Sequence, residues 1–232
     1  MIKIHRHFPY QMGTELNLDQ KAREDLVCAF EKPPMDCEDI LAGRAMIFET
    51  NLSGVGPVVI KHYKRGGLIR HLISDVYLRS GKARSRQEYE MLETVRSLGV
   101  SSPEPLAWAI RGSQFYKAYL ITRKIENTRS LTDICTKIPE QSAEALKKTA
   151  EQINRLIVNR IHHVDLHPGN VLVDGDGKVF IIDFDKAHIS PMSQKKLCKA
   201  YIKRWTRAVL KYKLPTIMVD ILVQELALLK AS

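Results

Sequence analysis

The most informative segment of the chain is His163-Val164-Asp165-Leu166-His167-Pro168-Gly169-Asn170. β-Branched runs on either side of a turn at Asp174-Gly175-Asp176-Gly177 predict a tight hairpin over 171–182 directly after it. Asp183 follows this hairpin, thirteen residues beyond Asn170. Since an antiparallel hairpin brings the outer ends of its two strands together, we expect Asp183 to lie close to the first segment.

Carboxylate and amide side chains in this order fit the chemistry of phosphoryl transfer. That reaction needs a carboxylate to accept the proton of the attacking hydroxyl, and oxygen ligands to hold Mg²⁺ against the phosphates of the nucleotide. Asp165 can supply the base, while Asn170 and Asp183 can supply the metal ligands. Any one of these residues more often caps a turn, but the ordered set at these spacings favours a catalytic site.

A phosphoryl-transfer site also needs a lysine on a strand and a carboxylate on a helix to hold it. A β-branched run that ends at Lys61 provides the lysine. A helix expected over 84–98 offers three glutamates, of which Glu88 shares a face with the apolar residues and Glu90 and Glu93 do not. Because an inward carboxylate needs a cationic partner, we expect Glu88 to pair with Lys61.

The surrounding pattern predicts an α+β fold with a strand-rich lobe at 1–122 and a reduced, helix-rich lobe at 123–232. Residues 1–38 show only weak periodicity. The expected elements are a hairpin over 45–61, helices over 66–80 and 84–98, a hairpin over 106–122, a helix over 141–158 and helices after Ser193 with a break near Pro215.

The charge of the chain is concentrated in two segments. The 232 residues contain 36 Lys and Arg against 26 Asp and Glu, a formal net charge of +10. From Lys61 to Arg86 there are eight basic residues and one acid, and from Lys195 to Lys213 there are eight basic residues and no acid. The rest of the chain is therefore mildly acidic. Both segments are expected to be amphipathic helices, so their charges are either simply solvated or form a surface for anionic head groups or phosphates.

Aromatic residues within the second basic segment allow two interpretations. Trp205 and Tyr201 could stack on nucleic-acid bases, but their helical spacing favours packing in the core. Histidines crowd the loop before Asn170 without the spacing of a zinc site, and His163 is instead expected to brace this loop through its ring nitrogens.

Several features bear on the cellular compartment. The four cysteines are scattered without a close pair, which favours a reducing, cytoplasmic environment. The most apolar stretch, Leu214 to Leu229, contains acidic residues and is too short to span a membrane, and Met1 to Tyr10 lacks the apolar core of a signal peptide.

Together these residues resemble the protein-kinase-like fold over roughly 40–190. Five further segments are informative: Lys61-His62-Tyr63-Lys64-Arg65-Gly66-Gly67-Leu68-Ile69-Arg70, Ser74-Asp75-Val76-Tyr77, Arg84-Ser85-Arg86-Gln87-Glu88-Tyr89, Leu120-Ile121-Thr122-Arg123 and Ile182-Asp183-Phe184-Asp185. Through these segments the chain more narrowly resembles the lipopolysaccharide kinase family, and within it the 3-deoxy-D-manno-octulosonic acid (Kdo) kinases.

The resemblance implies an ATP-dependent kinase that phosphorylates the 4-hydroxyl group of Kdo in Kdo-lipid A during lipopolysaccharide inner-core biosynthesis. It makes Asp165 the catalytic base, Asn170 and Asp183 the Mg²⁺ ligands, and Lys61 the residue that holds the α- and β-phosphates, oriented by Glu88. It also implies a peripheral location on the cytoplasmic face of the bacterial inner membrane. Segments 64–86 and 195–213 would then face anionic lipid, and nucleic acid becomes the weakest candidate partner.

The sequence departs from protein kinases in three places. The loop that covers the phosphates is reduced to Ala42-Gly43-Arg44-Ala45, so Gly43 is its only glycine. The metal motif ends in Phe184-Asp185 instead of Phe-Gly. About ten residues separate Asp183 from the helix expected after Ser193, which leaves no room for the long activation segment on which peptides dock.

Two other function classes remain open. The same catalytic residues would serve a kinase for a lipopolysaccharide core heptose or another small molecule, although the basic segment at 64–86 favours an anionic, membrane-held acceptor. A non-catalytic, kinase-like binding module is less consistent with the sequence, because all five candidate positions carry the residues that catalysis needs.

Overall fold

The computed structural model describes residues 2–31, 45–64, 77–78 and 81–229. The described residues form two compact units, one containing residues up to Glu90 together with Glu104–Lys124, the other Met91–Pro103 together with residues from Ile125 onward. The first unit is built on a large sheet and the second mainly on helices, which confirms the expected α+β class. The division into lobes at 1–122 and 123–232 stays a prediction; the two units differ from it in the placement of Met91–Pro103 and of residues 123–124.

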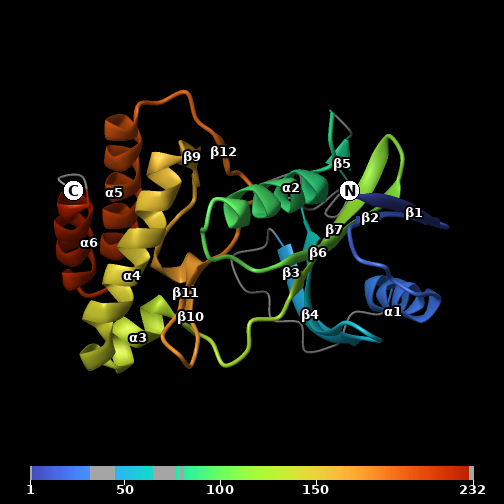
Figure 1. Cartoon of the computed structure of the whole chain (residues 1–232), viewed down its shortest axis with the longest axis horizontal. Coiled ribbons are helices and arrows are strands. Elements are labelled where there is room, and N and C mark those ends of the chain that lie inside the picture. Colours follow the sequence, from blue (N-terminus) through green and yellow to red (C-terminus); the bar gives the residue numbers. More distant parts are fainter. Residues whose placement is uncertain (1, 32–44, 65–76, 79–80, 230–232) are drawn as a thin grey trace. The chain divides into compact units, whose positions relative to one another are not determined.

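The first unit contains a seven-stranded antiparallel sheet (Figure 1). Its strands are β1 (Lys3–His7), β2 (Tyr10–Thr14), β3 (Ala45–Leu52), β4 (Gly56–Tyr63), β5 (Tyr77–Leu78), β6 (Pro105–Gly112) and β7 (Phe115–Arg123). They lie in the order β1-β2-β6-β7-β4-β3, and β5 also pairs with β7. The two hairpins expected over 45–61 and 106–122 are therefore confirmed, as β3–β4 and β6–β7.

The N-terminal segment adds structure that its weak periodicity did not predict. β1 and β2 pair with each other, and β2 extends the sheet by pairing with β6. β1 is an edge strand with mostly exposed or half-buried side chains, so it lacks the alternation that signals a strand. Helix α1 (Gln20–Glu31) then buries Ala22, Leu26 and Phe30 in the hydrophobic core of this unit.

The helix expected over 66–80 is wrong at its C-terminal end. Residues 65–76 and 79–80 lie outside the described residues, and the two described positions form β5. Tyr77 pairs with Tyr116 and Leu78 with Phe115 along β7. The sequence pattern showed an apolar face but not the start of β7, which extends beyond its pairing with β4 and pairs there with this segment.

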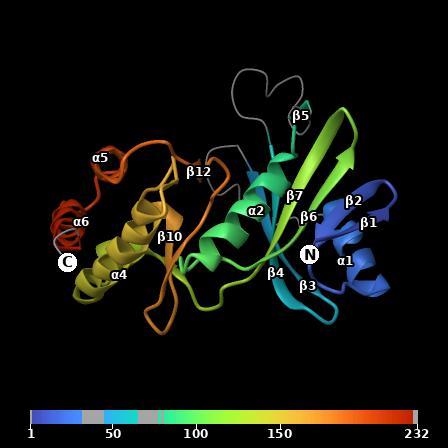
Figure 2. The same ribbon diagram turned by 45° about the horizontal axis from the view of Figure 1, so that its top comes forward.

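Helix α2 (Arg84–Ser97) is divided between the units, because residues up to Glu90 belong to the first and residues from Met91 to the second. The other helices of the second unit are α3 (Leu131–Lys137), α4 (Pro139–Val158), α5 (Gln194–Lys211) and α6 (Ile217–Leu228). Figure 2 shows α4 at the centre of this unit, where it packs against α3, α5, α6 and a strand of the small hairpin described below. The expected helix over 141–158 and the break near Pro215 are confirmed.

Short strands complete the second unit. They are β8 (Arg129–Ser130), β9 (Ile161–His162), β10 (Val171–Val173), β11 (Val179–Ile181) and β12 (His188–Ile189), with a 3₁₀ helix at Pro168–Asn170. β10 and β11 form the hairpin expected from the sequence, and β12 pairs with β9. The loops at the ends of these strands carry the predicted catalytic residues.

Candidate functional site

The hairpin brings two of the three predicted residues of this unit together. Val171 pairs with Ile181 in β10 and β11, and one residue further out the Ile182 amide donates to the Asn170 carbonyl at 3.0 Å. Asn170 and Asp183 therefore end neighbouring strands on the same side, as the sequence predicted. Asp183 adopts a left-handed backbone with φ of 64°, a conformation that aspartate tolerates better than most residues and that redirects the chain after β11.

Asn170 also holds the loop that carries Asp165. Its side chain is buried at 1% exposure, and its Nδ2 donates to the backbone carbonyl of Asp165 at 3.2 Å. The Asn170 amide donates to the His167 carbonyl at 2.8 Å, which closes the turn of the 3₁₀ helix. The loop is thus fixed at its base, while the Asp165 side chain remains 38% exposed and available to a substrate.

His163 braces this loop from the inside, as predicted. The residue is 2% exposed, and its Nε2 lies 3.0 Å from the Ile182 carbonyl. The Tyr201 hydroxyl accepts from the His163 amide at 2.8 Å and donates to the Ile161 carbonyl at 2.8 Å. Burial lowers the pKa of His163, so the ring is neutral and donates one hydrogen bond to the strand that precedes Asp183.

The residues of this unit fit a magnesium ion. The Oδ1 atom of Asn170 is enclosed and makes no hydrogen bond within the described part of the chain. An unsatisfied buried oxygen is costly unless a ligand completes it. Asp183 follows the end of the neighbouring strand, so the two residues offer the hard oxygen donors that Mg²⁺ prefers. Among the residues that the structure describes, no group of three or more His, Cys, Asp or Glu side chains forms a further metal cluster.

Two cations contact the carboxylate of Asp165, and neither was predicted from the sequence. Lys186 Nζ lies 3.2 Å from Oδ2, and Arg204 Nε lies 3.9 Å from Oδ1. Lys186 follows Asp183 by three residues. Because the sequence already predicted that Asp183 lies near the catalytic loop, a contact between Lys186 and Asp165 could have been predicted as well. Arg204 belongs to the basic segment 195–213, whose charges were expected either to be solvated or to face anionic groups, whereas its side chain is 22% exposed and turned toward the loop.

The predicted pair in the first unit is present. Lys61, on β4, donates to both carboxylate oxygens of Glu88, at 3.1 and 2.9 Å. The hydroxyl of Tyr63 donates to the same carboxylate. Glu90 is instead half-buried at the surface, where Lys82 and Arg86 lower its pKa against the opposing effect of burial. The helical pattern therefore selected the right glutamate.

The apolar stripe of α5 is part of the core, as expected. Trp205 and Tyr201 are 1% and 2% exposed, and the indole Nε1 donates to the Met218 carbonyl at 2.9 Å. These two rings are therefore not available to stack on bases. The exposed face of the helix carries Lys195, Lys196, Lys199, Lys203, Arg207 and Lys211.

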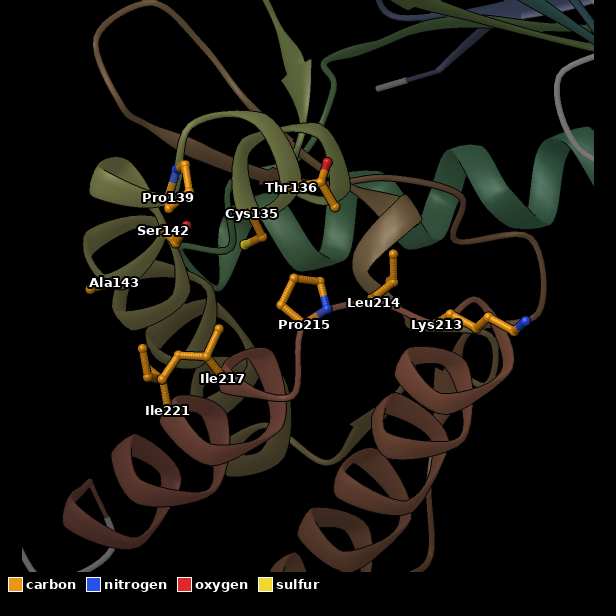
Figure 3. A pocket seen from close by; sticks show the side chains of 10 residues that line it. All are labelled: Cys135, Thr136, Pro139, Ser142, Ala143, Lys213, Leu214, Pro215, Ile217 and Ile221. Atoms are coloured by element: carbon orange, nitrogen blue, oxygen red, sulfur yellow. The ribbon is translucent and has the colours of Figure 1, made fainter.

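Part of the predicted site lies outside the described residues. This applies to Gly43 and to most of the basic segment at 64–86, of which 64, 77–78 and 81–86 are described. A hollow of about 680 Å³ opens elsewhere in the second unit, with Cys135, Pro139, Pro215 and Ile221 among its mostly apolar lining (Figure 3). None of the predicted catalytic residues lines it.

Comparison with known proteins finds relatives of this sequence. The sequence model of the Lipopolysaccharide kinase (Kdo/WaaP) family matches residues 43–219. The chain is 38% identical over 133 residues to a 3-deoxy-D-manno-octulosonic acid kinase of Vibrio cholerae, covering 56% of each protein. It is 37% identical over 130 residues to the kinase of that name from Vibrio parahaemolyticus, covering 55% of this chain and 54% of the relative. The chain thus spans about half the length of the curated relatives it matches.

Proposed function

Because the chain belongs to the lipopolysaccharide kinase (Kdo/WaaP) family, we propose that it transfers the γ-phosphate of ATP to the 4-hydroxyl group of Kdo in Kdo-lipid A. The observation that carries this proposal is the arrangement of the second unit, where Asp165 lies on a braced loop and Asn170 and Asp183 end paired strands. The names of the relatives supply the acceptor class.

In the proposed reaction, Asp165 accepts the proton of the acceptor hydroxyl as its oxygen attacks the γ-phosphorus. The bond from that phosphorus to the β,γ-bridging oxygen breaks, and ADP leaves. Lys61 binds the α- and β-phosphates, and Glu88 and Tyr63 fix the position of its ammonium group. Asn170 and Asp183 would hold Mg²⁺, which supplies positive charge against the triphosphate when bound.

The segment after Asp183 argues against a peptide acceptor. In protein kinases a long activation segment follows this position and binds the peptide. Here β12 pairs with β9 only a few residues after Asp183, through His188 opposite His162, and α5 begins at Gln194. The backbone of this short connection is already paired within the unit, which favours a small-molecule or glycolipid acceptor.

The exposed cations of α5 are proposed to dock on anionic lipid at the cytoplasmic face of the inner membrane, together with segment 64–86. No helix among the described residues is long and apolar enough to cross a membrane. Each cation near an anionic surface contributes about 1 kcal/mol of binding free energy. A surface of this kind would hold the enzyme beside a membrane-embedded acceptor.

The activity is tested by incubating the protein with ATP, Mg²⁺ and Kdo-lipid A, followed by mass spectrometry of the lipid and measurement of ADP. We expect one added phosphoryl group per acceptor. Transfer only to heptosylated core would identify a heptose kinase instead, and ATP binding without transfer to either acceptor would identify a non-catalytic module.

Membrane docking is tested by changing Lys195, Lys196, Lys199 and Lys203 to Gln and measuring sedimentation with vesicles that contain anionic lipid. We expect binding to weaken by at least about tenfold. A control with the same loss of charge changes four exposed lysines on other elements, Lys3, Lys21, Lys137 and Lys147. Equal losses in both variants would show a non-specific charge effect and remove α5 as the docking surface.

A further inference from the structure

The carboxylate of Asp165 has a cation against each of its oxygens. Lys186 Nζ lies 3.2 Å from Oδ2 and Arg204 Nε lies 3.9 Å from Oδ1. Lys186 is 47% exposed, so it can move, whereas Arg204 is held at 22% exposure. Two positive groups on one carboxylate leave a surplus positive charge beside the residue that must approach the acceptor.

We propose that Lys186 and Arg204 form the binding site for the carboxylate group of the acceptor sugar acid. The inference rests on the proposed function, because the acceptor named for the relatives is an acid. The inference names the groups that recognise this acid and explains how the enzyme would distinguish the acid from a neutral sugar with a similar hydroxyl.

The position of the hydroxyl brings the acceptor to these cations. A general base must lie about 2.6–3.2 Å from the group whose proton it accepts. The acceptor hydroxyl therefore binds at an Asp165 oxygen, within reach of Lys186 or Arg204. An incoming carboxylate draws the mobile Lys186 from Asp165 and frees Oδ2 for the hydroxyl, whereas a neutral sugar leaves the base ion-paired.

Both cations have donors for an incoming carboxylate. The ammonium group of Lys186 carries three N–H donors, of which the contact with Asp165 uses one. The Nε of Arg204 is enclosed and makes no hydrogen bond within the described part of the chain, so the donors left for a ligand are those of the two terminal nitrogens of the guanidinium. A guanidinium and a carboxylate match each other in bidentate geometry, which makes arginine suited to this role.

Arg204 also differs from the basic residues around it. Lys203 and Arg207 are exposed on the outer face of α5, while Arg204 on the same helix is turned toward the catalytic loop. The helix therefore carries cations toward solvent and one cation toward the base. The γ-phosphate of ATP is a second anion that could bind to these groups. We favour the acceptor because both cations contact Asp165, the residue that accepts the proton of the acceptor hydroxyl.

The test combines protein variants with a modified acceptor. Lys186→Met, Arg204→Met and wild type are assayed with Kdo-lipid A and with its methyl ester, in which the sugar carboxylate is neutral. Lys147→Met, an exposed lysine on α4, is the control with the same loss of charge. For wild type and the control, we expect esterification to lower kcat/KM by about tenfold or more.

In the two site variants, esterification should lower kcat/KM by no more than about threefold, because one of the two cations that bind the carboxylate is already absent. On the native acceptor these variants should raise the KM for Kdo-lipid A about tenfold and leave the KM for ATP unchanged. Arg204→Lys should retain part of the activity, and ATP affinity measured for each variant confirms that the protein is folded.

Two results would overturn the proposal. Equal losses on esterification in wild type and variants would show that the cations do not contact the carboxylate, and a raised KM for ATP alone would assign them to the γ-phosphate. Failure of wild type to phosphorylate either acceptor would instead refute the proposed function, and the carboxylate site with it.

Discussion

Each of the two units contains one lysine–carboxylate pair of the proposed chemistry, and the two pairs differ in construction. In the first unit, Lys61 and Glu88 are 14% and 3% exposed and lie 2.9 Å apart. In the second unit, Lys186 and Asp165 are 47% and 38% exposed and lie 3.2 Å apart. One pair is enclosed and the other is open to solvent.

The difference follows from the elements that carry the pairs. Lys61 is on a central strand and Glu88 on a helix, and the hydroxyl of Tyr63 adds a third contact. An enclosed charge pair has lost its hydration and is retained because each partner needs the other. The pair of Lys186 and Asp165 lies on loops and keeps its hydration, so the lysine can exchange one anion for another. The buried pair is therefore suited to hold a fixed orientation and the exposed pair to meet a substrate.

The largest effect is expected from Asp165→Ala. Loss of the general base should lower kcat by about 10²–10⁴-fold. ATP affinity should change little, because Asp165 acts on the acceptor hydroxyl. Rapid-quench measurement of transfer and fluorescence titration with a nucleotide analogue check the two parts. A large loss of nucleotide affinity would contradict the proposal that the Lys61 pair binds the nucleotide and the Asp165 pair acts on the acceptor.

Breaking the buried pair should act mainly on stability. Glu88→Ala leaves the ammonium of Lys61 in its enclosed position without this carboxylate, and we expect a loss of about 3 kcal/mol in the free energy of unfolding. The two tryptophans allow the first unit to be observed alone, because Trp108 is on β6 and Trp205 is on α5.

In a Trp205→Phe background, urea unfolding followed by fluorescence therefore reports the first unit. Asp165→Ala in the same background is the matched control and should shift this transition by less than about 0.5 kcal/mol. If Glu88→Ala were as mild as the control, the buried pair would not stabilise this unit.

The same contrast explains what the sequence could predict. The Lys61–Glu88 pair followed from the pattern, because strand and helix periodicities determine which side chains share a face. The order of Asp165, Asn170 and Asp183 along a hairpin was equally local, and the structure brings Asn170 and Asp183 to neighbouring strand ends. The periodicity of the sequence therefore predicted those parts of the site whose positions depend on regular helices and strands.

The missed features depend on neighbours distant in sequence. Arg204 lies at the border of the polar face of α5, and only the packing of α5 against the catalytic loop turns it toward Asp165. Tyr77–Leu78 becomes a strand because the start of β7 extends beyond β4, and β1 is a strand because β2 provides a partner. Local pattern carries no information about such partners.

A smaller effect is expected from pH at His167, in the loop of the exposed pair. Burial, together with the nearby Arg204, lowers the pKa of His167 to about 4. Its Nδ1 accepts from the Gly169 amide at 3.1 Å, which only the neutral ring can do. The pKa of His167 is lower in the folded than in the unfolded protein, so the neutral ring contributes to the free energy of unfolding. This contribution is complete above about pH 6.5 and is lost as the pH falls toward 4.

His167→Asn keeps a side-chain acceptor at this position without the titration. Between pH 7 and 5, we expect the wild type to lose about 1–2 kcal/mol more stability than the variant. Urea unfolding in a Trp108→Phe background, with Trp205 as the reporter of the second unit, measures the difference. Parallel pH profiles would show that His167 is not held neutral by the fold.

The smallest effect is expected where the two lysines are compared directly. Lys186→Met should change the free energy of unfolding of the second unit by less than about 1 kcal/mol, because an exposed ion pair in water contributes little. Lys61→Met leaves the carboxylate of Glu88 in an enclosed position without this ammonium and should cost about 3 kcal/mol in the first unit. Each variant is measured in the single-tryptophan background that reports its own unit. If Lys186→Met destabilised the protein as strongly as Lys61→Met, the ion pair at Asp165 would be a fixed structural element and its lysine could not move to an acceptor.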